Sequence, residues 1–434
     1  MLNVLNTTWA LMLGIFLLQL GNGLQGTLLG VRGSLEGIDP SVMGYVMSGY
    51  FVGFLGGSKL TPILLGQVGY IRVFAALGSI VSAAFILYAS IVSPMAWFFF
   101  RVVVGFSICG IYVVAESWLN HSADNATRGQ ALSLYLIVQM TGIVLGQLLL
   151  NTADPSGYDL FVLISVLVSL SITPMLLSST AAPLHQSSQS MSLRELMDTS
   201  PLGTVGMFLM GGVFACLFAM SPIYATERGL SLSQTSTFIM MIFIGGMVFQ
   251  YPIGWLSDRM DRRRLIVVLA IIGAFMAWIG IMFDSFGAVV IAGLVIGGTS
   301  NPLYSLLVAY TNDYLEHDQM SAAAGGLLFV NGLGAMFGPI LIGYAMSSFG
   351  AEWFFITLLL LMSAIALYGI YRMTRRSTVD IEYHVPYVPM GTRSTPITAE
   401  MAMDIVEEEV LEAAEEAEEA DSAGDVGDSE DERN

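Results

Sequence analysis

Polar side chains recur at helical spacing inside otherwise apolar stretches of the sequence. Gln19, Asn22 and Gln25 follow one another at three-residue steps, which puts them on neighbouring positions of one helix face. Asn301 and Tyr304 repeat this spacing later in the chain. Amide and phenol groups both donate and accept hydrogen bonds, so such a face suits a small polar ligand. A single amide often only joins two helices, but a stripe of three favours a ligand cavity.

Basic side chains also fall inside apolar stretches. A buried charge is costly unless it is paired or hydrated, so Arg101 and Lys59 are candidates for ligand binding. Either side chain could instead extend its charged end to a polar surface, and for Lys59 we favour that interpretation. We add Tyr112, Gln139 and Asn331 as further polar residues of a cavity.

Other kinds of chemistry find no support in the residue pattern. Cys109 and Cys216 are single thiols without His or Cys at ligand spacing, so neither a disulfide framework nor a zinc site is indicated. The chain lacks a G-x-x-x-x-G-K-[ST] nucleotide loop, a Ser/His pair and an H-E-x-x-H motif. We therefore expect no catalytic residue, no metal and no cofactor, and we favour an intramembrane enzyme or a receptor least.

The composition indicates which elements must position these side chains. Of the 434 residues, 55% are hydrophobic and 12% are charged, against about 25% charged in soluble proteins. This excludes a soluble globular protein. An apolar run of about 20 residues spans a bilayer as one helix. Twelve runs are predicted to do so, at 8–31, 42–65, 73–92, 95–119, 129–151, 158–178, 202–226, 233–256, 265–283, 286–310, 320–345 and 352–372.

Basic residues between the runs predict the orientation of the chain. Arginines favour cytoplasmic loops, and twelve spans put both termini on one side. Only Arg32 and Arg228 fall on the side opposite the termini. The side that carries the termini has Arg72, Arg128, Arg194, Arg259, Arg262, Arg263, Arg264, Arg372, Arg375 and Arg376. We expect both termini in the cytoplasm, and an integral protein of a plasma membrane such as the bacterial inner membrane.

The sequence also repeats itself at an offset of 192 residues. Phe51 matches Phe243, Gly53 matches Gly245, and further pairs follow along both halves. We predict an all-helical membrane protein of two pseudo-symmetric six-helix bundles. The expected parts are an N-terminal half (1–178), a central cytoplasmic loop (179–198), a C-terminal half (199–373) and a tail (374–434). In the central loop, Ser192 and Glu195 form a capping box that predicts a short helix.

The tail differs sharply from the rest of the chain. It holds 18 acidic and 4 basic residues, and so supplies most of the formal charge of -18. This charge repels phosphates, so no nucleic-acid partner is expected. Met401, Ile405 and Val406 lie at helical spacing and suggest a weakly amphipathic helix. We expect the tail to be largely disordered and solvated.

Several motifs resemble those of a known family. The segment from Gly254 to Arg264, GWLSDRMDRRR, resembles the loop signature G-x-L-[AS]-D-R-x-G-R-R of the major facilitator superfamily, with Asp261 in place of its second Gly. The equivalent loop of the first half has Gly66 where the family carries its Asp. The segment Glu116-Ser-Trp-Leu-Asn, with Arg128-Gly129, is similar to the YcaD-like branch of that superfamily. The resemblance implies the major facilitator fold and transport, and leaves the substrate open.

The resemblance also suggests residues that control conformational change. A carboxylate among arginines at the end of a span can hold one conformation closed, and we favour this interpretation over plain positive-inside topology. We take as gating candidates Arg72, Glu116, Arg128, Asp258, Arg259, Arg262 and Arg263. In the first half, Glu116 is the candidate to replace the missing loop Asp.

We therefore expect a secondary transporter that moves a small molecule across the lipid bilayer by alternating access. Uptake of a small polar or anionic solute fits the amides and Arg101. Proton-coupled efflux of an apolar or drug-like compound fits the weakly charged, methionine-rich interior. Protons are the candidate coupling ion and a monomer is the expected form.

Overall fold

The computed structural model describes residues 2–122, 125–177, 191–375, 384–391 and 394–406. These residues are helical wherever they form regular structure, and 12 helices are long and apolar enough to cross a membrane. All twelve predicted runs coincide with one of them, which confirms the fold class. The first half contains α1 (Leu2–Leu35), α2 (Pro40–Val68), α3 (Tyr70–Ser90), α4 (Pro94–Ser122), α5 (Asn125–Leu149) and α6 (Asp159–Leu177).

The second half follows a short helix, α7 (Leu193–Thr199), which the Ser192–Glu195 capping box begins as predicted. Its helices are α8 (Pro201–Ala215), η1 (Cys216–Met220), α9 (Ser221–Glu227), α10 (Leu232–Ser257), α11 (Arg262–Met282), α12 (Phe286–Asn312), α13 (His317–Phe349) and α14 (Trp353–Met373). The segments α8, η1 and α9 together make one span. The π-helical η1 widens this span at its middle, a local distortion that is common at functional sites.

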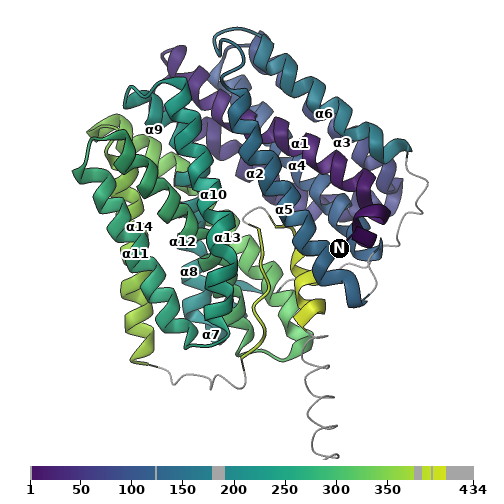
Figure 1. Cartoon of the computed structure of the whole chain (residues 1–434), viewed down its shortest axis with the longest axis vertical. Coiled ribbons are helices and arrows are strands. Elements are labelled where there is room, and N and C mark those ends of the chain that lie inside the picture. The colour runs from purple at the N-terminus through teal and green to yellow at the C-terminus, as the bar shows by residue number, and fades with distance from the viewer. Residues whose placement is uncertain (1, 123–124, 178–190, 376–383, 392–393, 407–434) are drawn as a thin grey trace, which may run out of the picture.

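The helices pack as two bundles that lie side by side (Figure 1). Within each bundle equivalent pairs pack together, such as α2 with α4 and α10 with α12. The bundles meet where α2 packs on α13, α5 on α10 and α1 on α9. This arrangement leaves the space between α1, α2, α4, α8 and α13 to be filled by side chains or by a cavity.

Glycines allow the closest helix contacts, and they do so equally in both bundles. A Cβ on Gly53 would lie 1.9 Å from the carbonyl oxygen of Val102, and one on Gly245 would lie 1.9 Å from that of Leu294. The two sites are related by the offset of 192 residues found in the sequence. The internal repeat therefore describes the same backbone packing made twice.

The two ends of the molecule carry different elements. We call the end with α7, the loop between α10 and α11 and the described tail residues 384–391 and 394–406 the tail face. It lies at the bottom of Figure 1, and α9 lies at the top, on the opposite face. The yellow tail lies between the bundles near this lower end (Figure 1).

Candidate functional site

A cavity of about 800 Å³ lies between the two bundles. Its walls come from α1, α2 and α4 on one side and from α8, η1 and α13 on the other. Lys59, Ser192 and Pro396 line it near the tail face, so the cavity extends to that face. Its volume falls within the range typical of sites for small molecules.

The opposite face is closed by contacts between the bundles. Ser347 of α13 donates a hydrogen bond to Asp39 beside α2 at 2.9 Å, and Asn151 donates one to Ser236 at 2.9 Å. Gly44 of α2 approaches α13 so closely that an added Cβ would lie 2.3 Å from the Pro339 oxygen. The structure therefore shows a cavity that is closed on one face and extends to the other.

A hydrogen-bonded cluster on α1 and α4 carries the polar stripe. Asn22 donates to Gln19 at 3.3 Å and to the hydroxyl of Tyr112 at 3.2 Å, and this hydroxyl donates to Gln19 at 2.8 Å. Asn22 and Gln25 line the cavity, whereas Gln19 and Tyr112 lie behind them. Gln25 is almost fully buried, and its amide nitrogen has no hydrogen-bond partner in the described part of the chain. This nitrogen is a donor that a ligand could engage.

Arg101 lies at the same wall and is 5% exposed. It donates to Gln25 at 2.8 Å and to the Met47 sulfur at 2.7 Å, and its guanidinium lies 5.4 Å from the centre of the Tyr50 ring. Arg101 therefore lines the cavity and is held there by these contacts. The structure supports a buried position beside the cavity for this residue, and not the alternative in which its charged end extends to a polar surface. Lys59, the second cation, is exposed near the tail face and lies over Phe329.

The charges of the cavity are of one sign only. Arg101 and Lys59 both line it, and none of its described lining residues is Asp or Glu. Both cations belong to the first half of the chain. A low-dielectric cavity strengthens the field of the charges that line it, so a ligand in this cavity would meet a positive potential.

Aromatic rings form much of the remaining wall, and the sequence analysis did not identify them. They are Tyr50, Phe51, Phe54, Phe214, Phe218 and Phe329. Phe218 lies within the π-helical η1, which turns it and Ala219 to the cavity. The spacing of these rings is that of ordinary membrane helices, so only the packing separates the lining rings from those that face lipid.

Besides Gln19 and Tyr112, which lie behind the wall, three more of the predicted cavity residues do not line it. Asn301 packs against Gly246, where an added Cβ would lie 1.7 Å from its amide nitrogen. Tyr304 is buried against Phe214, with ring centres 5.8 Å apart, and Gln139 is buried beside Tyr135. Asn301 and Tyr304 pack against neighbouring helices, and Gln139 is buried beside Tyr135 of its own helix, so these residues are corrected to packing positions. Asn331 does line the cavity and donates to the Met207 carbonyl at 3.1 Å.

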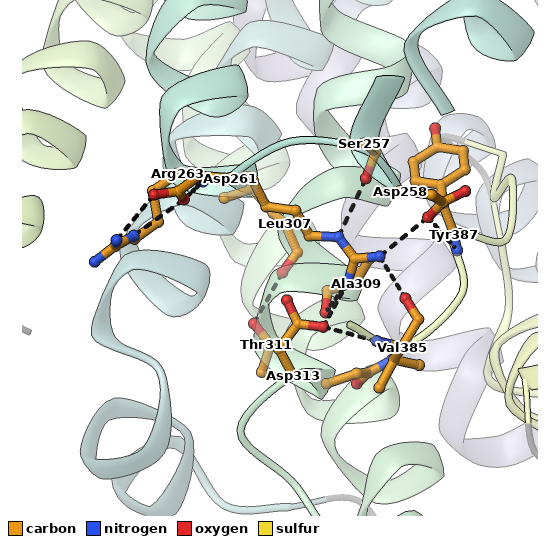
Figure 2. A network of polar contacts seen from close by, with 12 residues as sticks. Ser257, Asp258, Asp261, Arg263, Leu307, Ala309, Thr311, Asp313, Val385 and Tyr387 are labelled. Carbon is orange, nitrogen blue, oxygen red and sulfur yellow. Dashed lines mark hydrogen bonds and ion pairs between the residues drawn. The ribbon is translucent and has the colours of Figure 1, made fainter. Parts of the chain in front are cut away.

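A network of charges lies at the tail-face end of the second half (Figure 2). Arg262 is 1% exposed and pairs with Asp313 at 2.5 Å and with Asp258 at 3.2 Å. The tail completes the network: the amides of Val385 and Tyr387 donate to Asp313 at 3.1 Å and to Asp258 at 3.0 Å. Burial raises the pKa of Asp313 to about 6, although Arg262 acts in the opposite direction.

The other loop arginines contribute less to this network. Asp261 begins α11 by accepting the backbone N–H of Arg263 at 2.9 Å, and it also pairs with the Arg263 side chain. Arg259 lies over the ring of Trp255. Arg72 is exposed and makes no polar contact in the described part of the chain, since Gly66 stands where the second half has Asp258. Of the proposed gating residues, Asp258 and Arg262 therefore have the geometry of a latch, and Arg72 does not.

In the first half the gating candidates contact the tail. Glu116 is 1% exposed and accepts hydrogen bonds from the hydroxyls of Tyr135, at 3.0 Å, and Thr395. Arg128 of α5 lies 3.6 Å from Asp404. No pairing of Glu116 with Arg72 or Arg128 occurs among the described contacts, so the described structure does not place Glu116 in the role of the missing loop Asp.

The expectation of a solvated tail is wrong for its described part. Thr395, Met401 and Val406 are at most 1% exposed, and residues 396–406 form a helix. The apolar positions Met401, Ile405 and Val406 are buried against the bundles because they form one face of this helix. Residues 376–383, 392–393 and 407–434 lie outside the described residues, so the expectation for them stays untested.

Comparisons with known proteins agree with this architecture. A family described as the Major Facilitator Superfamily matches residues 11–251 and 202–386. An uncharacterized MFS-type transporter YcaD from Escherichia fergusonii is 26% identical over 351 residues, which cover 80% of this chain and 90% of that protein. Among solved structures, the nucleoside transporter NupG superimposes with a TM-score of 0.71 at 14% identity, covering 85% of this chain and 100% of NupG. The Escherichia coli fucose:proton symporter FucP gives 0.53 at 13% identity, covering 85% and 99%.

Proposed function

The chain belongs to the major facilitator superfamily and is an integral membrane transporter of the secondary kind, and from this premise we propose that it takes up a small polar or anionic solute. One observation carries the proposal. The cavity wall of the first half presents Arg101, Asn22 and Gln25, and no described lining residue is acidic. A cation supplies attraction and amides supply orientation, which is the combination that recognises an anion in a low-dielectric site.

The closure of the cavity on one face supports alternating access. The cavity is closed on the opposite face by the contacts of α2 with α13, and it extends to the tail face. A transporter of this architecture works by rocking one bundle against the other around a fixed site. We propose that the tail face is cytoplasmic, because the arginines of the loops gather there, and that the membrane is a bacterial inner membrane.

We also propose protons as the coupling ion and a monomer as the working form. The support for protons is Glu116, a carboxyl that is buried within α4 and bonded to two hydroxyls. Buried carboxyls within spans are common carriers of protons. Glu116→Gln should then leave solute binding in place and remove the dependence of accumulation on a pH gradient.

Efflux of an apolar compound is the second candidate, because six aromatic rings line the cavity. The two candidates differ in the charge of the preferred ligand. A purified protein that binds neutral apolar compounds more tightly than anions of the same size would favour efflux.

Alternating access itself can be tested without a ligand. Spin labels at Gln67 and Glu316 report on the tail face, and labels at Tyr45 and Phe349 report on the opposite face, since all four side chains are exposed. Cys109 and Cys216 are fully buried, so introduced cysteines should take the label. We expect a minor population that is shorter for the first pair and longer for the second. Distances that never change in opposite senses would contradict the proposal.

A further inference from the structure

We propose that the ligand is an organic anion with a flat aromatic body. This inference rests on the proposed function and names its substrate class. The cations and the aromatic rings lie in the same cavity, so one ligand meets both. Phe214 and Phe218 stack at 5.6 Å, and Phe218 stacks on Phe243 at 4.9 Å. The second half therefore presents a row of packed rings opposite the charged wall.

The second half offers little else to a ligand. Its lining residues are mostly Phe, Gly, Ala and Leu, with Ser321 and Asn331 as its polar members. Asn331 already donates to the Met207 carbonyl. A ligand with hydroxyl groups all round, such as a sugar, would leave many of its groups unpaired against this wall. A flat apolar body gains area and ring contacts there.

The charged end of the ligand belongs at Arg101 and Gln25. Both are nine-tenths buried, and the Gln25 amide nitrogen has no hydrogen-bond partner among the described residues. A carboxylate accepts from guanidinium and amide donors together. The ring of Tyr50, over which Arg101 lies, borders this site and can contact the ligand body.

Three probes of one shape test the class: 2-naphthoate, its neutral amide and its saturated decahydro acid. Titration calorimetry with the purified full chain should rank naphthoate first, with the amide and the saturated acid each weaker by about tenfold or more. Arg101→Gln should reduce naphthoate affinity to that of the amide, and Phe218→Leu should remove the advantage over the saturated acid. Equal affinity for naphthoate and its amide would contradict the proposal that the ligand is an anion. Equal affinity for naphthoate and the saturated acid would contradict the proposal that its body is aromatic. Lack of binding by all three would also overturn the class, while the spin-label distances decide separately whether the chain is an alternating-access transporter.

A second inference rests on different residues: we propose that the described tail residues 384–391 and 394–406 form an intramolecular wedge that holds the cavity open to the tail face. Its first part binds the second half. Besides Val385 and Tyr387, the Met390 amide donates to Ser305 at 3.0 Å, and Gln250 donates to the Tyr387 hydroxyl at 2.9 Å. The Tyr387 ring also packs closely on Gly254, where an added Cβ would lie 2.7 Å from it.

Its helical part binds mainly the first half. The Thr395 hydroxyl accepts the N–H of Ile397 at 3.2 Å and donates to Glu116 of α4. Asp404 pairs with Arg128, and Asn312 of α12 donates to the sulfur of Met403 at 3.0 Å. Pro396 and Ile397 line the cavity. The segment thus contacts both bundles and the cavity on the face that must close when the opposite face opens.

The docked tail prevents the tail face from closing. For closure, the two bundles would have to approach each other through the volume that this segment occupies, and protein interiors are too densely packed to accommodate it. The buried apolar face of the helix must therefore leave before the tail face closes. Release of the tail is then a step that limits the change of state and that a binding partner or a modification of the tail can control.

Two truncations test the wedge without a ligand. Removal of 384–434 takes away the wedge, and removal of 407–434 takes away most of the acidic residues but keeps it. In the spin-label pair at Gln67 and Glu316, the longer truncation should raise the short-distance population about fivefold or more, and the shorter one should leave it unchanged. Equal distributions for the full chain and the longer truncation would overturn the wedge, as would an equal effect of both truncations.

A point variant covers the case in which the longer truncation fails to fold. Thr395→Val keeps the shape of the side chain and removes the donor to Glu116, so it should raise the short-distance population by a smaller factor. Ser394→Ala is the control, because the described hydrogen bond of that hydroxyl lies within the tail. In folded Thr395→Val protein, an unchanged population would count against the wedge.

Discussion

The two halves of the chain share one scaffold and differ in the wall that each presents to the cavity. At the shared offset of 192 residues, Gly53 and Gly245 bring α2 to α4 and α10 to α12 in the same way. The lining positions behave otherwise: Asn22 corresponds to Phe214, Gln25 to Leu217 and Arg101 to Gly293. Backbone packing therefore follows the repeat, whereas ligand recognition does not.

This difference assigns separate roles to the two walls. The first half supplies the charge and the hydrogen-bond donors, and the second half supplies apolar area and the π-helical distortion at η1. The tail-face ends differ as well, since Arg262 and Asp258 correspond to Tyr70 and Gly66. Each difference can be removed by substitution, and each predicts an effect in one half only.

The largest effect should come from the shared scaffold, and it should be equal in the two halves. Gly53→Ala and Gly245→Ala both place a Cβ 1.9 Å from a backbone oxygen, so each should destabilise the fold by about 3 kcal/mol or more. Thermal unfolding of the purified variants measures this. Gly66→Ala, with no atom within 4 Å, is the control and should be neutral. A large effect in one half alone would break the symmetry of the scaffold.

The next effect belongs to the charged wall. Arg101→Gln removes the buried cation and should weaken binding of an organic anion by about 1.5–3 kcal/mol, because charge-assisted hydrogen bonds contribute that much. Lys59→Gln, at the exposed mouth, should weaken it by less than about threefold. Affinities measured by calorimetry separate the two variants. If Lys59 proved the more important cation, the site would have to lie closer to the tail face.

An equivalent pair of positions sharpens the contrast between the walls. Asn22→Ala should cost about 1–3 kcal/mol of binding, because it removes a polar group that lines the cavity and is bonded to Gln19 and Tyr112. Phe214→Leu, at the matching position, should reduce affinity for the aromatic acid and leave the preference for acid over amide intact. Folded yield is measured beside affinity, since a stripe with only a structural role would lower the yield and keep the affinity.

The latch should have a smaller effect. Asp258→Asn weakens the ion pair with Arg262 and the hydrogen bond from Tyr387, and a half-exposed pair contributes about 0.5–1 kcal/mol. We expect the short-distance population on the tail face to rise about twofold to fivefold, with ligand affinity changed by less. Gly66→Asp places the acid in the first half, where Tyr70 replaces the arginine, and should change neither. An effect of Gly66→Asp equal to that of Asp258→Asn would remove the distinction between the two loops.

The smallest effect concerns pH. Burial raises the pKa of Asp313 to about 6 and raises that of Glu400, which lies beside Asp404. Arg262, Asp258 and the Val385 amide face Asp313, and Glu116 faces the tail from α4. Docked carboxyls with raised pKa take up protons, so docking strengthens as the pH falls through about 6 and weakens as it rises.

The expected change is a twofold to fourfold loss of the short-distance population between about pH 7.5 and about pH 5.5. The spin-label pair at Gln67 and Glu316 measures it, and the variant Asp313→Asn with Glu400→Gln should show less dependence on pH. A short-distance population that grows on acidification would contradict the sign.

Hydropathy, the repeat and the loop signature were enough to predict the twelve spans and the two bundles, because each span must satisfy its backbone polar groups within itself and the repeat divides the spans into equivalent halves. Of the polar stripe of α1, Asn22 and Gln25 line the cavity and Gln19 lies behind them, so the stripe indicated the right wall but not every lining residue. Asn301 and Tyr304 show the limit of this reasoning: the same spacing there leads to packing against Gly246 and Phe214. Spacing identifies a face of a helix but not what that face meets.

The tail was beyond the reach of sequence reasoning for a related reason. Its net charge describes residues 374–434 as a whole, and the few apolar positions that dock are diluted within it. Met401, Ile405 and Val406 carried the signal for a helix, but the groove that buries them is formed by helices far apart in the chain. The aromatic lining was hidden likewise, because rings that face lipid and rings that face the cavity share one composition.

The central claim is that a small organic anion crosses the membrane through the cavity between the bundles. Uptake of radiolabelled 2-naphthoate into liposomes that contain the purified chain tests it most directly, with Arg101→Gln at the same protein density as the matched control. The account predicts saturable uptake by the wild-type chain that falls about tenfold or more in the variant. Equal uptake by the variant, or uptake no greater than in protein-free liposomes, would contradict it.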